Sequence, residues 1–103
     1  MTLPFLEELR PHFRAATRER LRQMRAQLDA LAADPAQAEP LLRNFHALTG
    51  LGGTYGFPRL SELGDEAEET LLAVVRRGAP LTPELERRWR EIVEEMEREV
   101  GGA

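Results

Sequence analysis

The chain has 103 residues and a net charge of −4, 42% of its residues are hydrophobic, and it contains no cysteine. This length and hydrophobic content predict one domain over residues 1–103, and they argue against intrinsic disorder. The lack of cysteine excludes disulfides, thiol nucleophiles and cysteine-bound metals. The acidic balance disfavours nucleic acid as a partner. No apolar run is long enough for a membrane span and no export signal is recognisable, so we expect a cytoplasmic protein.

The first third of the chain is expected to be helical. Pro4 favours the start of a short helix, and Pro11 is expected to kink or restart it. A longer helix should cover 12–33, because apolar side chains recur at steps of four and three from Phe13 onward. The six arginines of the first 25 residues are interpreted as a solvated face, and His12 as an ordinary exposed histidine.

Three more amphipathic helices follow. Asp34 and Pro35 predict a cap and one short turn, after which a helix is expected at about 40–54. Proline and glycine signals bound the next helix at about 58–77, and a cap, a proline and an acid open the last one at about 83–100. Four such helices without a strand pattern predict an all-α antiparallel four-helix bundle with a short extra helix at its N-terminus.

One histidine in the second predicted helix is surrounded by small residues. His46 lies at the edge of the apolar seam, and Gly50 and Gly53 lie on the same side of the helix, one and two turns further on. A glycine inside a helix costs about 1 kcal/mol relative to alanine. We interpret the three glycines between Gly50 and Gly53 as clearing space, so that another macromolecule can reach the imidazole.

Two short runs around this histidine match a known pattern. The run 46–50 reads His-Ala-Leu-Thr-Gly, and the run 53–57 reads Gly-Thr-Tyr-Gly-Phe. Together they resemble the histidine-phosphotransfer (HPt) domain of two-component signalling, in particular the N-terminal domain of CheA-type chemotaxis kinases. The resemblance spans about 19–100 and includes the Arg-Arg-Gly run that ends at Gly78. It implies a phosphocarrier with no cofactor and no ATP site of its own.

The resemblance also implies roles for two residues. His46 would accept the phosphoryl group on Nε2, and Glu68 would accept a hydrogen bond from Nδ1–H and so orient the ring. The implied partners are a histidine kinase catalytic domain that donates the phosphoryl group and a response-regulator receiver domain whose aspartate accepts it. Gly50 and Gly53 would let the receiver approach the ring.

The chain departs from the family at Thr49, where the family has a lysine one turn past the histidine. Threonine can donate one hydrogen bond but carries no charge, whereas Arg43, one turn before His46, could bind phosphate through two N–H groups. A second interpretation stays open: a degenerate module that docks receivers or dimerises without being phosphorylated. A metal-binding bundle is disfavoured, because neither histidine has a glutamate three residues before it.

Overall fold

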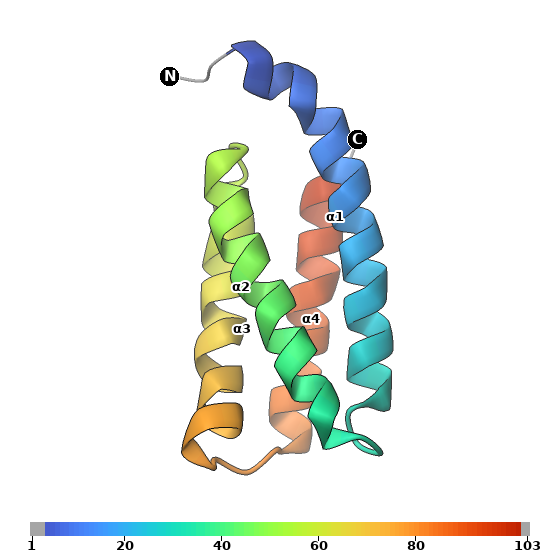
Figure 1. Ribbon diagram of the computed structural model, residues 1–103, viewed down its shortest axis with the longest axis vertical. Coiled ribbons are helices and arrows are strands. Elements are labelled where there is room, and N and C mark those ends of the chain that lie inside the picture. Colours follow the sequence, from blue (N-terminus) through green and yellow to red (C-terminus); the bar gives the residue numbers. More distant parts are fainter. Residues whose placement is uncertain (1–3, 102–103) are drawn as a thin grey trace.

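The computed structural model describes residues 4–101, with side chains from residue 7 onward. Within these residues the chain forms four α-helices, one 3-10 turn and no strand. The helices alternate in direction, so the predicted all-α antiparallel four-helix bundle is confirmed (Figure 1). The elements are α1 (Pro4–Ala30), η1 (Pro35–Gln37), α2 (Ala38–Thr54), α3 (Pro58–Arg77) and α4 (Pro83–Gly101).

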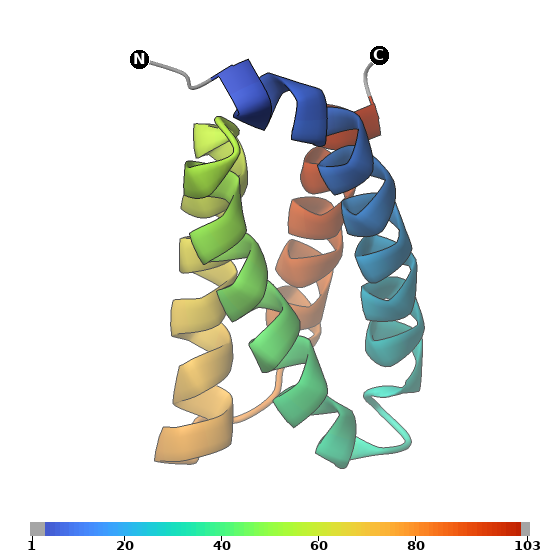
Figure 2. The same cartoon turned by 45° about the horizontal axis from the view of Figure 1, so that its top comes forward.

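The expected separate helix at the N-terminus is wrong, because α1 runs through Pro11 without a break. Pro11 lacks an amide hydrogen, so it cannot bond to the carbonyl of Glu7, but both residues are exposed and water can satisfy that carbonyl. The first turns of α1 lie across the end of the bundle, over the turn between α2 and α3 (Figure 2). There Phe13 stacks on Tyr55 with ring centroids 4.6 Å apart.

Most of the other boundaries agree with expectation to within two residues. The helix expected at 12–33 ends earlier, at Ala30. The Asp34 carboxylate caps η1 by accepting a hydrogen bond of 3.2 Å from the amide of Ala36. The turn η1 then runs directly into α2 at Ala38. Pro40 lies in the first turn of α2 and is tolerated there, because its missing amide hydrogen is not needed.

The helices α2 and α3 pack very closely, and two glycines make this possible. A methyl group on Gly52 would lie 2.8 Å from Leu60 Cβ and 3.0 Å from the Phe57 carbonyl oxygen. A methyl group on Gly64 would overlap the Thr49 hydroxyl. The interpretation of all three α2 glycines as access to the imidazole is therefore wrong for Gly52, which is buried against α3.

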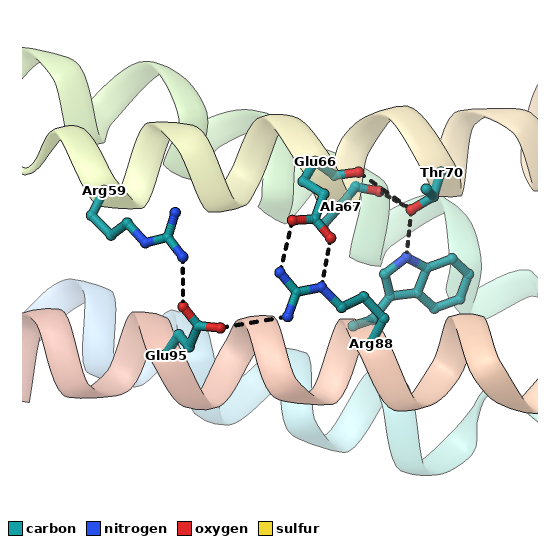
Figure 3. Close-up of polar contacts among 7 residues, drawn as sticks. Arg59, Glu66, Ala67, Thr70, Arg88 and Glu95 are labelled. Carbon is teal, nitrogen blue, oxygen red and sulfur yellow. Dashed lines mark hydrogen bonds and ion pairs between the residues drawn. The ribbon is translucent and has the colours of Figure 1, made fainter.

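The contact between α3 and α4 is made instead by long side chains (Figure 3). Arg88 donates to both carboxylate oxygens of Glu66, at 2.6 and 2.7 Å. The indole nitrogen of the fully buried Trp89 donates to the Thr70 hydroxyl at 2.8 Å. A continuous apolar core lies inside the bundle, with Trp89 and Phe45 as its largest fully buried side chains. It holds α3 in place between α2 and α4.

Candidate functional site

His46 lies in the middle of α2 and projects from the bundle into solvent. Phe45, next to it in the chain, and Leu48, one turn after Phe45 on the inner face of α2, are fully buried. The backbone that carries the histidine is therefore anchored in the core. The His46 side chain itself is 76% exposed. The helix therefore presents an exposed imidazole on a backbone that is anchored in the core.

Glu68 on α3 contacts this imidazole. Its Oε2 lies 2.5 Å from His46 Nδ1, so the contact expected from the resemblance is present. Ala67 beside it is fully buried and fixes the helix there, and the glutamate side chain is only 18% exposed. Gly64, one turn earlier on α3, permits the close approach of the two helices that brings the carboxylate within reach.

The partner at Nδ1 determines what the other ring nitrogen can do. An ionised carboxylate only accepts hydrogen bonds, so Nδ1 of His46 must carry the proton that Glu68 accepts. In the neutral ring Nε2 then has a free lone pair. An exposed nucleophilic nitrogen with its opposite nitrogen held by a carboxylate is the arrangement needed for nucleophilic catalysis.

A groove of about 460 Å³ runs beside the imidazole between α2 and α3. Arg43, expected to supply charge, lines it, is exposed, and has no ion-pair partner within the described part of the chain. The groove also contains residues that sequence reasoning did not assign to the site. They are Leu42, Leu72 and Arg76.

Helical spacing could have revealed these residues. Leu72 and Arg76 follow Glu68 by one and two turns, and Leu42 precedes His46 by one turn, so all of them share the faces that carry the two expected residues. What spacing could not reveal is the ion pair between Arg76 and Glu39, which joins α3 to α2 at the far end of the groove.

Thr49, which stands at the family's lysine position, faces α3. Its hydroxyl donates to the carbonyl of Phe45 at 2.9 Å, and Gly64 lies directly against it. The single proton of this side chain is therefore already used inside the bundle. A phosphoryl group on His46 would receive neither charge nor a free hydrogen-bond donor from Thr49.

Gly50 and Gly53 lie on the open side of α2, where both are exposed. A methyl group on Gly50 would have no neighbouring atom within 4 Å, and one on Gly53 would make only an ordinary contact of 3.5 Å with the Ser61 hydroxyl. Space inside the bundle therefore does not require these two glycines.

The fold and the site together define a class of protein: a helical bundle with an exposed histidine whose Nδ1 contacts a carboxylate. A family model for the Hpt domain matches residues 8–99, and the chain belongs to that family. Hpt domains are phosphocarriers without a catalytic site of their own, and they exchange phosphoryl groups with kinases and receiver domains in two-component signalling. No curated protein and no solved structure matches the chain at a significant level.

The helices carry no signature of a membrane span. Within residues 4–101, none of them combines the length and the apolar character that crossing a bilayer requires.

Proposed function

We propose that His46 is the phosphoryl acceptor of this domain and that it reacts through Nε2. The observation that carries the proposal is the 2.5 Å contact between Nδ1 and the Glu68 carboxylate, on a ring that is otherwise exposed. A carboxylate at Nδ1 favours the tautomer with the proton on Nδ1, which supports Nε2 as the nitrogen with the free lone pair. Phosphoryl transfer depends mainly on such positioning and on charge stabilisation.

The Nε2 lone pair of His46 attacks the phosphorus of an aspartyl phosphate on a receiver domain, and a P–N bond forms. The P–O bond to the aspartate breaks, and its electron pair leaves with the carboxylate. The proton on Nδ1 stays in its hydrogen bond to Glu68, so the positive charge that develops on the ring lies next to a carboxylate. The reverse reaction returns the phosphoryl group to a receiver.

Arg43 is the proposed cation for the bound phosphoryl group. It is one turn before His46 on α2, lines the same groove and has no carboxylate partner among residues 4–101. Arginine can bind two phosphate oxygens at once. It would take over the part that the family lysine plays and that Thr49 does not.

The proposed partners are a donor and an acceptor of the phosphoryl group. A histidine kinase catalytic domain supplies the phosphoryl group from ATP, and a receiver aspartate accepts it, in the cytoplasm. The runs 46–50 and 53–57 favour the CheA type, in which the carrier domain works for a chemotaxis kinase. The domain would act there either as a free carrier or as part of a larger kinase.

Labelling with radioactive phosphate tests the proposal. A receiver charged with acetyl phosphate is incubated with the chain, and acid-labile label on the chain is measured. His46→Gln should keep the helical circular-dichroism signal and take no label. His12→Gln is the matched control, because His12 is the other histidine and is also exposed, and it should be labelled like wild type.

Two results would overturn the proposal. Label that persists in His46→Gln would move the acceptor to another residue. A wild-type chain that binds receivers but takes no label from them, from a kinase with ATP, or from a chemical phosphoryl donor would instead be a docking or dimerisation module.

A further inference from the structure

Glu39 lies within reach of two arginines of the groove. It precedes Arg43 by four residues on α2, and an acid at that spacing before a basic residue is the favourable order for an ion pair along a helix. The structure nevertheless pairs Glu39 with Arg76 of α3. Both terminal nitrogens of Arg76 donate to the carboxylate, Nη1 to Oε1 and Nη2 to Oε2, the latter at 3.3 Å.

Arg43 is affected by this pairing through charge. Arg76 binds both oxygens of Glu39 and offsets its negative charge, which weakens the attraction of Glu39 for Arg43. Arg43 itself has no ion pair among the described residues. Arg43 is also the arginine nearest to His46 along α2, one turn away. Without Arg76, the Glu39 carboxylate would be free to pair with Arg43 along the helix and to draw it away from the imidazole.

We propose that Arg76 is a positioning residue: it holds Glu39 and thereby keeps Arg43 available to the phosphoryl group on His46. This inference rests on the proposed function of His46 and adds a control of its charge environment. Arg76 acts in it through two other side chains and need not touch the phosphoryl group. A direct contact between Arg76 and phosphate is the competing explanation, since Arg76 lines the same groove.

The pair can be removed without endangering the fold. The Arg76 side chain is 56% exposed and that of Glu39 is 40% exposed. Ion pairs at such exposure contribute little to stability. Arg77 provides a matched control, because it is the next residue in the last turn of α3, is also exposed, and forms no ion pair among residues 4–101.

The experiment uses phosphoramidate as donor, so that no partner protein is needed. A bond forms between the phosphorus of phosphoramidate and Nε2 of His46, while the bond from that phosphorus to the amino group of the donor breaks and ammonia leaves. At low salt, Arg76→Ala should reduce the initial rate of labelling by up to about fivefold. Arg77→Ala should leave the rate unchanged, with melting temperatures recorded for both. Adding Glu39→Gln to Arg76→Ala should restore the rate, because an amide no longer competes for Arg43.

A second combination of substitutions checks whether Arg76 acts through Arg43. In an Arg43→Ala background, Arg76→Ala should have no further effect on the rate. A loss in Arg76→Ala that Glu39→Gln does not rescue, or that persists without Arg43, would overturn the inference in favour of a direct phosphate contact or a structural role. Wild type and Arg76→Ala labelled at the same rate would overturn the inference alone. A wild type without label on His46 would overturn the proposed function and this inference with it.

Discussion

Two acids of α3, Glu66 and Glu68, are only two residues apart, yet they belong to regions of opposite character. Glu66 faces α4, where Arg88 binds both of its carboxylate oxygens and also reaches Glu95 (Figure 3). Glu68 faces α2, where the imidazole of His46 is its partner. The first acid is held by a group that stays charged at every physiological pH. The second contacts an imidazole whose side chain is 76% exposed.

The two contacts differ in the groups that they leave without a partner. On the α4 side the guanidinium groups of Arg88 and Arg59 lower the pKa of the Glu66 and Glu95 carboxyls, respectively, through hydrogen bonds. These carboxylates and guanidinium groups are thus paired with one another. On the α2 side the helices meet through glycines. Two polar groups beside the groove have no partner among the described residues: Nε2 of His46 and the guanidinium group of Arg43. A site requires groups that the fold has not already satisfied.

The largest expected effect comes from replacing each of these two acids by alanine. Glu68→Ala should slow the labelling of His46 by about tenfold, because it removes a charge-assisted hydrogen bond at Nδ1. Glu66→Ala should leave that rate unchanged and lower the melting temperature instead. Parallel labelling and thermal melts of the two variants check this. Equal rates in both variants would show that the carboxylate at Nδ1 does not orient the ring.

The glycines give the next largest effect, on stability. Gly64→Ala should lower the free energy of unfolding by ~1–3 kcal/mol, because the added methyl group overlaps Thr49 and lies 3.1 Å from the Phe45 carbonyl oxygen. Gly50→Ala should instead raise it by up to ~1 kcal/mol, since the position is open and alanine favours helix. Urea unfolding of both variants measures the difference. Similar changes in the two would contradict the distinction between packing and access.

Helical periodicity explains how much of this could be foreseen. The pattern of apolar residues predicts which face of each helix is buried, and so it predicted the bundle and placed His46 at the edge of the apolar seam. It could not distinguish Gly52 from Gly50, because that distinction depends on which neighbouring helix comes close. The expected break at Pro11 was wrong as well. The cost of a proline inside the helix is outweighed by the contacts that the first turns of α1 make across the end of the bundle.

The ion pairs were out of reach of sequence reasoning for a different reason. The chain has 14 arginines and 18 acidic residues, and several of its ion pairs join different helices, such as Arg25 with Glu97 and Arg90 with Asp29, so spacing along one helix does not predict them. The choice of Arg76 for Glu39, instead of Arg43, depends on the register of α3 against α2 and on the reach of a long side chain. Those are properties of the assembled bundle.

Thr70→Val tests whether the α3–α4 contact is purely structural. The Thr70 hydroxyl accepts the indole hydrogen of Trp89 at 2.8 Å, and valine would leave that buried donor without a partner. The free energy of unfolding should fall by ~1–2 kcal/mol, as measured by tryptophan fluorescence in urea. Thr70→Ser keeps the hydroxyl and should lose much less. A marked change in the labelling rate of His46 would show that this contact also serves the site.

A smaller effect is expected from pH. Because the pKa of Glu66 is lowered in the fold by its hydrogen bonds to Arg88, its contribution to stability is present above the unfolded value of about 4.3 and is lost as the pH falls through the folded value. Thermal stability should therefore hold between neutral pH and about pH 5 and decline below it. Glu66→Gln should show a shallower decline. If wild type and Glu66→Gln lost stability equally at low pH, the Glu66–Arg88 pair would not be the cause of the decline.

The smallest effect concerns Thr49. A lysine there would bring a charge close to the phosphoryl group on His46, but an exposed contact of this kind contributes only ~0.2–1 kcal/mol. Thr49→Lys should therefore raise the labelled fraction by less than about fivefold, and the gain should shrink as salt rises, because salt screens exposed charges. Thr49→Gln, which is also long but neutral, is the control and should show no salt-dependent gain.

The same substitution sharpens the comparison of charges around the ring. If Arg43 now acts alone, Arg43→Ala should reduce labelling more in wild type than in Thr49→Lys, because the lysine would take over part of its task. Equal losses in both backgrounds would mean that Arg43 does not compensate for the missing lysine. The open arginine beside the groove would then serve the docking of a partner, and the weak charge environment of His46 would be a property of this carrier.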